Sequence, residues 1–162
     1  MALKFNVVAR LATLFNRSKT NTGTSVMTVT PDGAKEWRNK DGELHREDGP
    51  AYEARDGSQG WYINGKLHRV GGPALTRANG DKEWYLNGLL HREDGPALDF
   101  VNGGYAWYKN GRLSREDGPA LHRPDGWEEW YRDGHQMSVS DIAAIQERMK
   151  SVKENSRARA LT

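Results

Sequence analysis

The chain consists of short apolar–polar alternations separated by turn-forming dipeptides. In the segment DKEWYL, at 81–86, an extended chain would place Lys82, Trp84 and Leu86 on one face and the intervening side chains on the other. The segments SQGWYI, GYAWYK and EEWYR repeat the Trp-Tyr pair, although Trp37 in the first repeat is followed by an arginine. A period of two over so few residues predicts short, half-buried β-strands.

These segments recur at a constant spacing, which is the sequence signature of a repeat architecture. Gly-Pro-Ala and Trp each return every 23 residues, and only the first interval between tryptophans is longer by one residue. The recurring positions are Trp37, Trp61, Trp84, Trp107, Trp130, Gly49, Pro50, Gly72, Pro73, Gly95, Pro96, Gly118 and Pro119. Because proline has no backbone N–H, each Gly-Pro predicts a bend, bulge or edge of the sheet. We therefore assign these residues a structural role.

Each repeat also contains two turn signals. The first series consists of Asp32-Gly33, Asp56-Gly57, Asn79-Gly80, Asn102-Gly103 and Asp125-Gly126. The second series consists of Asp41-Gly42, Asn64-Gly65, Asn87-Gly88, Asn110-Gly111 and Asp133-Gly134. Asn-Gly and Asp-Gly favour the positive φ angles of type I′ hairpin turns. The pattern predicts an array of β-hairpins over 32–137, with the tryptophans aligned in a buried ladder along one face.

The two ends have helical patterns. Residues 1–18 place Leu3, Val7, Leu11 and Leu14 on one face of a predicted amphipathic helix, and 19–31 form a linker and a predicted first strand, VMTVT. Residues 138–162 begin with a Ser-x-x-Asp pattern typical of a helix N-terminus and predict a capping helix with a basic tail. Either helix could cover an open end of the array, and the N-terminal one could instead contact a membrane surface or an acidic partner.

The spacing resembles that of MORN-type repeats and related short β-repeats. The residues that carry the resemblance are NGLLHREDGPALDFVNG followed by YAWYKNG, and the resemblance covers about 105 of the 162 residues. Gly-Pro-Ala stands where MORN repeats have Gly-x-Gly. The HREDGPA variant is most similar to repeats in small proteins of bacteriophages and bacteria. The resemblance implies a mainly β, elongated and twisted antiparallel sheet of 23-residue hairpin repeats, used for binding or as a scaffold.

Composition narrows the functional classes. Only 36% of the residues are hydrophobic, which argues against a thick core, and the chain has no cysteine, so disulfides and thiolate metal sites are excluded. Residues 31–137 carry 15 basic and 19 acidic groups, so −4, which does not favour nucleic-acid binding, while the two ends are basic. Arg10 interrupts the apolar N-terminal run, so we interpret 1–18 as part of a mature, cytoplasmic protein and not as a signal peptide.

The charged motif LHREDGPA could suggest catalysis, but its recurrence does not. An active site is normally one constellation of unlike residues, whereas His45, His68 and His91 occupy equivalent positions, and Ser114 replaces the fourth histidine. Equivalent histidines two strand spacings apart, about 9–10 Å, cannot share one zinc ion. We predict that the aspartates accept backbone N–H bonds at a turn and that the arginines pair with acids or lie over aromatic rings.

We therefore expect no enzyme activity, no cofactor and no metal, and a protein as the partner. The candidate contact residues are Tyr62, Tyr85, Tyr108 and Tyr131, predicted to form an exposed row, with Arg10 and Arg17 at the N-terminus. The resemblance implies a phage accessory protein that binds and inhibits a host or defence factor in the host cytoplasm. The alternatives are a structural subunit of a virion, a homo-oligomer, or a binder of nucleic acid or a small ligand. The breaks in the repeat, at Gly71 and Ser114, are the positions that the periodicity leaves unexplained.

Overall fold

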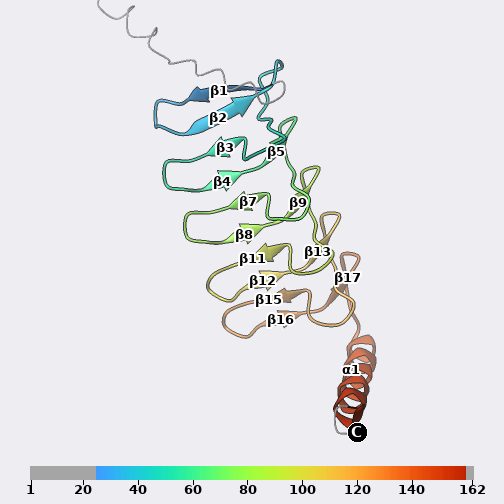
Figure 1. The fold of residues 1–162 in the computed structure, drawn as a ribbon. Coiled ribbons are helices and arrows are strands. Elements are labelled where there is room, and N and C mark those ends of the chain that lie inside the picture. The colour runs from blue at the N-terminus through green and yellow to red at the C-terminus, as the bar shows by residue number, and fades with distance from the viewer. Residues whose placement is uncertain (1–24, 160–162) are drawn as a thin grey trace, which may run out of the picture.

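Residues 25–159 of the computed structural model form a long stack of antiparallel β-hairpins followed by one C-terminal helix (Figure 1). This confirms the prediction of a mainly β protein with a helix at its C-terminal end. The predicted helix over 1–18, with Arg10 and Arg17, lies outside the described residues. The predicted first strand is present as β1, Val26–Val29.

A ten-stranded antiparallel sheet runs along the whole stack. In the order in which they pair, its strands are β1 (Val26–Val29), β2 (Lys35–Arg38), β3 (Tyr52–Glu53), β4 (Gln59–Gly60), β7 (Leu75–Thr76), β8 (Lys82–Glu83), β11 (Leu98–Asp99), β12 (Tyr105–Ala106), β15 (Leu121–His122) and β16 (Glu128–Glu129). Most of these strands have only two residues. Such short strands are marginal alone, so each hairpin depends on its neighbours in the stack.

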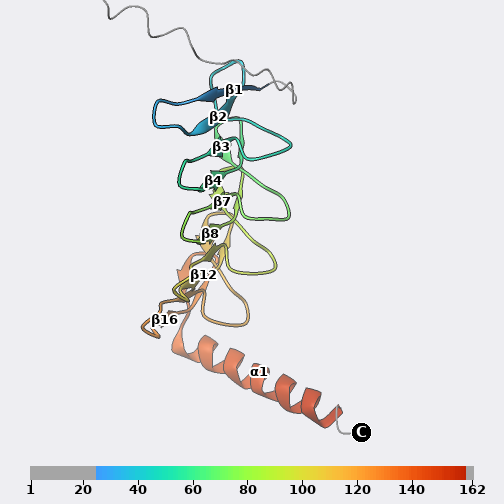
Figure 2. The same cartoon turned by 60° about the vertical axis from the view of Figure 1, so that its left-hand side comes forward.

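A second column of small hairpins lies beside the sheet (Figures 1 and 2). It consists of β5 (Tyr62–Ile63) with β6 (Lys66–Leu67), β9 (Tyr85–Leu86) with β10 (Leu89–Leu90), β13 (Tyr108–Lys109) with β14 (Arg112–Leu113), and β17 (Tyr131–Arg132) with β18 (His135–Gln136). Neighbouring hairpins are hydrogen bonded to each other: Arg69 N–H donates to the Tyr85 carbonyl, and Gly88 N–H donates to the Leu67 carbonyl. The stack therefore has two parallel columns of backbone hydrogen bonds.

The predicted continuous strand at 81–86 is divided at Trp84. Its first part, β8, belongs to the large sheet, and its last part, β9, belongs to the second column. The backbone N–H of Trp84 donates to the Ala97 carbonyl of the next repeat, and the Trp84 carbonyl accepts from the N–H of His91. Because both backbone groups are satisfied in different columns, the tryptophan is the corner at which the chain changes from one column to the other.

The ten turn signals all lie at turns, but they are of two kinds. Asn64, Asn87, Asn110 and Asp133 have φ of 47–52° and are followed by a glycine with positive φ, as predicted for type I′ turns. In the first series, and at Asp41-Gly42, only the glycine has a positive φ. Hydrogen bonds from Gly57 N–H to the Ala54 carbonyl and from Ala54 N–H to the Ser58 carbonyl identify a three-residue loop there. The type I′ prediction was therefore wrong for these six positions, because loop length selects the turn.

Small side chains form the centre of the stack. Ala51, Ala74, Ala97 and Ala120 are completely buried, whereas no large side chain among residues 25–159 is fully buried. Trp37 is 6% exposed, but Trp61, Trp84, Trp107 and Trp130 are only half-buried. The expected buried tryptophan ladder is therefore correct only at its first member, and the fully buried column is made of alanines instead.

The helix α1, Val139–Arg159, follows the last hairpin (Figure 2). Ser138 begins it as predicted, since its Oγ accepts a hydrogen bond from the N–H of Asp141 at 3.2 Å. Ile142, Ile145, Met149 and Val152 form one apolar stripe along the helix. Ile145 packs against the end of the stack and is 6% exposed, whereas Met149 and Val152 are exposed. Within residues 25–159, no helix has the length and apolar character needed to cross a membrane.

Candidate functional site

The charged motif forms a short arm in four of the repeats, at 45–50, 68–73, 91–96 and 114–119, which we call the first to fourth arms. In every arm the guanidinium of the arginine lies over the tryptophan of its own repeat. The distances from Cζ to the ring centroid are 4.3 Å for Arg46 on Trp37, 3.9 Å for Arg69 on Trp61, 4.0 Å for Arg92 on Trp84 and 4.4 Å for Arg115 on Trp107. The prediction that the arginines lie over rings is confirmed, and this contact is a cation–π interaction.

The glycine of each Gly-Pro lies directly against the guanidinium. A Cβ added to Gly49 would lie 2.5 Å from Cζ of Arg46, and one added to Gly95 would lie 2.5 Å from Cζ of Arg92. Neither glycine has a positive φ, so close approach and not backbone conformation requires it. The following proline contributes its carbonyl, because Nη1 of Arg46 donates to the Pro50 oxygen at 3.3 Å. The guanidinium is thus held between an aromatic ring and a glycine.

The histidine of an arm holds the hairpin turn of the next repeat. Nδ1 of His45 lies 2.8 Å from Oδ1 of Asn64 and accepts a hydrogen bond at 3.2 Å from the backbone N–H of the same asparagine. His68 with Asn87 and His91 with Asn110 make the same contacts. In the fourth arm, Oγ of Ser114 accepts the equivalent N–H, from Asp133, at 3.1 Å. Serine therefore preserves the contact, which explains the break in the histidine pattern.

The aspartates of the arms bond to the arginines. Asp48, Asp94 and Asp117 each accept a hydrogen bond at 2.9 Å from Nε of the arginine two residues earlier, where the backbone N–H groups of the turn were expected as donors. The hydrogen bond and charge of Arg92 lower the pKa of Asp94. The charged side chains of the arms therefore interact with one another and with the backbone.

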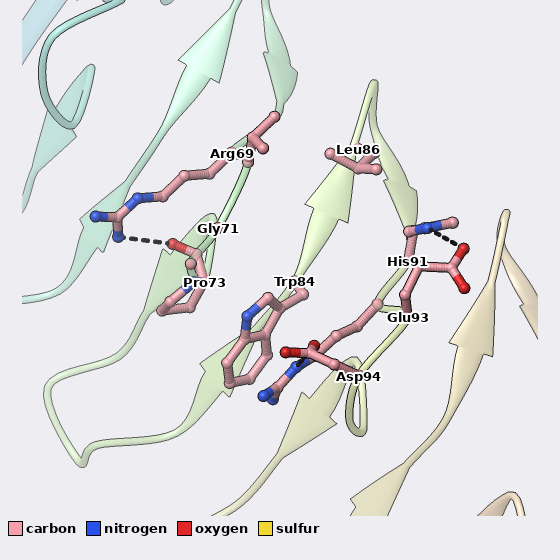
Figure 3. A pocket seen from close by; sticks show the side chains of 11 residues that line it. Arg69, Gly71, Pro73, Trp84, Leu86, His91, Glu93 and Asp94 are labelled. Carbon is pink, nitrogen blue, oxygen red and sulfur yellow. Dashed lines mark hydrogen bonds and ion pairs between the residues drawn. The ribbon is translucent and has the colours of Figure 1, made fainter.

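The second arm lacks this aspartate. Gly71 occupies its position with a φ of 76°, and Val70 occupies the position of the preceding glutamate and is 80% exposed. Arg69 still donates to the Pro73 carbonyl at 3.2 Å, but no carboxylate among the described residues forms an ion pair with it. Beside it, a cleft of about 350 Å³ lies between the second and third arms and is lined by Trp84, Leu86 and both arms (Figure 3).

The four tyrosines of the predicted exposed row are half-buried. Burial is the main cause that raises the pKa of Tyr85 to about 12, and its hydrogen bond to Glu83, at 2.9 Å, adds to it. Glu83 is itself 6% exposed and also accepts a hydrogen bond from Nε of Arg77 at 3.0 Å. Tyr62 lies against Gly60, and burial also raises its pKa. The expected accessible row is therefore only partly accessible, and its role in binding stays a prediction.

The last tryptophan has no arginine of its own, because the array ends before a fifth arm. Trp130 instead lines a cleft of about 610 Å³ between the fourth arm and α1, to which the helix contributes Met149, Lys150 and Lys153. The helix thus stands where a further repeat would continue the array. This arrangement was not predicted from the sequence, although the absence of an arginine at Ser138 could have indicated it.

No chemistry-bearing constellation emerges from the arms. Within the part of the chain that the structure describes, no three His, Asp or Glu side chains gather as a metal site would require. The equivalent histidines are each engaged with a different turn. Comparison with known proteins adds no assignment, since no protein-family model matches the chain and no curated protein matches it.

Proposed function

We propose that the protein is a non-catalytic array of 23-residue, MORN-like β-hairpin repeats, with an amphipathic helix at each end, that acts as a protein-binding module. The observation that carries this proposal is the internal use of the repeated motif. Its arginines lie over tryptophans, its aspartates bond to those arginines, and its histidines hold the next turn. Residues occupied in this way serve the stack, so function must lie on the surfaces that the stack presents.

Exposed apolar side chains support a protein as the partner. Met149 and Val152 continue the apolar stripe that begins with Ile142 and Ile145 and are exposed, and Met149 also lines the cleft beside the fourth arm. Val70 is exposed on the second arm. Apolar side chains with a polar surround are typical of interfaces between proteins. An elongated stack also presents a large surface for its size, as in other repeat proteins that bind by an extended face.

The resemblance to phage repeat proteins adds the proposal that the partner is a host or defence factor in an infected cell. The second candidate is a structural subunit of a virion. The exposed half of α1 and the edge strands β1 and β16, each paired with one other strand among the described residues, support it, because they could contact neighbouring subunits.

Affinity purification from host cells tests the proposal. The tagged protein should retain one host protein in a stoichiometric amount, identified by mass spectrometry and stable to moderate salt. A matched variant with Met149→Lys and Val152→Lys keeps the buried Ile145 and tests whether α1 is part of the interface. Absence of any stoichiometric partner at every salt concentration contradicts the proposal. Recovery of the protein from purified particles favours the structural subunit instead.

A further inference from the structure

We propose that the second arm is a docking site for an acidic side chain of a protein partner, whose carboxylate takes the position on Arg69 that an internal aspartate takes in the other arms. This inference rests on the proposed function and names a contact within it. The four arms can be compared with one another, since the same motif occurs four times and only the second arm lacks the aspartate.

The guanidinium of Arg69 is held in the same way as its three equivalents. It lies 3.9 Å from the centroid of Trp61 and donates to the Pro73 carbonyl at 3.2 Å, close to the 3.3 Å of the other three arms. In those arms Nε also donates a hydrogen bond, to an aspartate at 2.9 Å. Arg69 is therefore positioned to donate to a carboxylate, but its own arm supplies none.

The space for that carboxylate is open. A Cβ built on Gly71 meets no atom within 4 Å, and the adjoining cleft of about 350 Å³ is bounded by Trp84 and by the third arm (Figure 3). The acids of the third arm have partners already, because Asp94 bonds to Arg92 and Glu93 pairs with His91 at 3.1 Å. The missing partner of Arg69 must therefore come from outside the arms.

Val70, next to Gly71, indicates the chemistry of the partner segment that carries the acidic side chain. Val70 stands where the other arms have glutamate, so the second arm loses two negative charges and gains an apolar side chain that is 80% exposed. An acidic residue next to an apolar residue, on one segment of a protein, complements both features. Electrostatic complementarity of this kind fixes the register of an interface.

The double substitution Val70→Glu and Gly71→Asp tests the site by restoring the motif of the other arms. The aspartate alone would strain the present backbone at Gly71, but together the two changes give the arm the sequence HREDGPA of the first and third arms, which accommodate it. We expect the variant to fold and to bind the captured partner about 10–100-fold more weakly, as loss of a charge-assisted hydrogen bond requires. The matched control, Glu47→Val with Asp48→Gly, converts the first arm to the sequence of the second and should not weaken binding.

Nuclear magnetic resonance of the arginine Nε–Hε groups supplies a test that needs no captured partner. The probe is the peptide acetyl-Leu-Glu-Leu-amide, and the control is its glutamine analogue. The acidic peptide should shift the Arg69 signal in preference to those of Arg46, Arg92 and Arg115, and the glutamine peptide should not. Restoring the second arm should abolish the shift, and the control variant should gain a second one, at Arg46. Equal shifts of all four arginines, or none at millimolar peptide, would overturn the proposal.

The two proposals fail in different ways. If the wild-type protein and the restored variant capture the same partner with equal affinity, the module binds protein but not through Arg69. If the peptide shifts Arg69 and no protein is captured, the carboxylate site stands and the proposed function falls.

Discussion

Replacement of Gly49 by alanine should weaken the first arm only through Arg46. The new Cβ would lie 2.5 Å from Cζ of Arg46 and 2.7 Å from its Nε, so the guanidinium must leave its place. It then loses the cation–π contact with the buried Trp37, about 1–2 kcal/mol, and a long hydrogen bond to the Pro50 carbonyl, about 0.5 kcal/mol. The ion pair with the half-exposed Asp48 adds little because solvent screens it.

Two gains oppose this loss. The released arginine recovers side-chain freedom, up to about 1 kcal/mol, and alanine reduces the entropy of the unfolded chain by about 0.4–1 kcal/mol. In an Arg46→Ala background the clash is absent and only the second gain remains. A double-mutant cycle should therefore show a coupling free energy of about 1–2 kcal/mol between the two substitutions, with Gly49→Ala neutral or stabilising once Arg46 is removed.

Urea denaturation followed by tryptophan fluorescence measures the four unfolding free energies, and equal m values across the variants confirm that the cycle compares the same transition. Gly103→Ala is the matched control. Gly103 has a φ of 89° and open space around its Cβ position, so its cost comes from the backbone and should be the same with or without Arg46. If Gly49→Ala changes the free energy of unfolding by the same amount in both backgrounds, the conclusion that the guanidinium of Arg46 is held between the Trp37 ring and Gly49 is wrong.

Three further outcomes are expected. Asn87→Ala should cost about 1–2 kcal/mol in urea unfolding, because φ is 52° there and the side chain contacts His68, while Asn87→Gly should cost less. Tyr85 should ionise with a pKa of about 12 in an absorbance titration and the signal should vanish in Tyr85→Phe. Because the folded pKa is raised above 10, this tyrosine's contribution to stability is complete below pH 10 and is lost between about pH 10 and 12. Ala74→Leu should overpack the fully buried site and cost about 1–3 kcal/mol, measured by thermal unfolding.

The positions of turns and strands could be predicted from the sequence because they depend on local chemistry. Asn64-Gly65 needs no tertiary contact to favour a type I′ turn, and Ser138 caps α1 through neighbouring residues. The stacking of Arg46 on Trp37 was also predictable, since an arginine follows the tryptophan by eight residues in three repeats and by nine in the first. These features follow from residues that are close in sequence or that recur.

Features that depend on how two repeats meet could not be predicted. The break of the strand at Trp84 arises because its N–H bonds to Ala97 of the next repeat. Tyr85 was expected to be accessible on an alternating strand, but the chain turns one residue earlier, and the tyrosine packs over Glu83 instead. Gly71 departs from the repeated motif in the sequence, but the open space that it leaves beside Arg69 depends on how the arm folds.

Because both columns of backbone hydrogen bonds repeat from unit to unit, the length of the stack can change only by whole units. Each junction between repeats reuses the same three donors, the N–H groups of a tryptophan, an arginine and a glycine. Insertion or deletion of one 23-residue unit would shift everything beyond it by two strand spacings, about 9–10 Å, and leave every remaining junction unchanged. The distance between the Arg69 cleft and α1 therefore depends on the number of units between them, and duplication of a unit would change that distance without a change in the interior contacts.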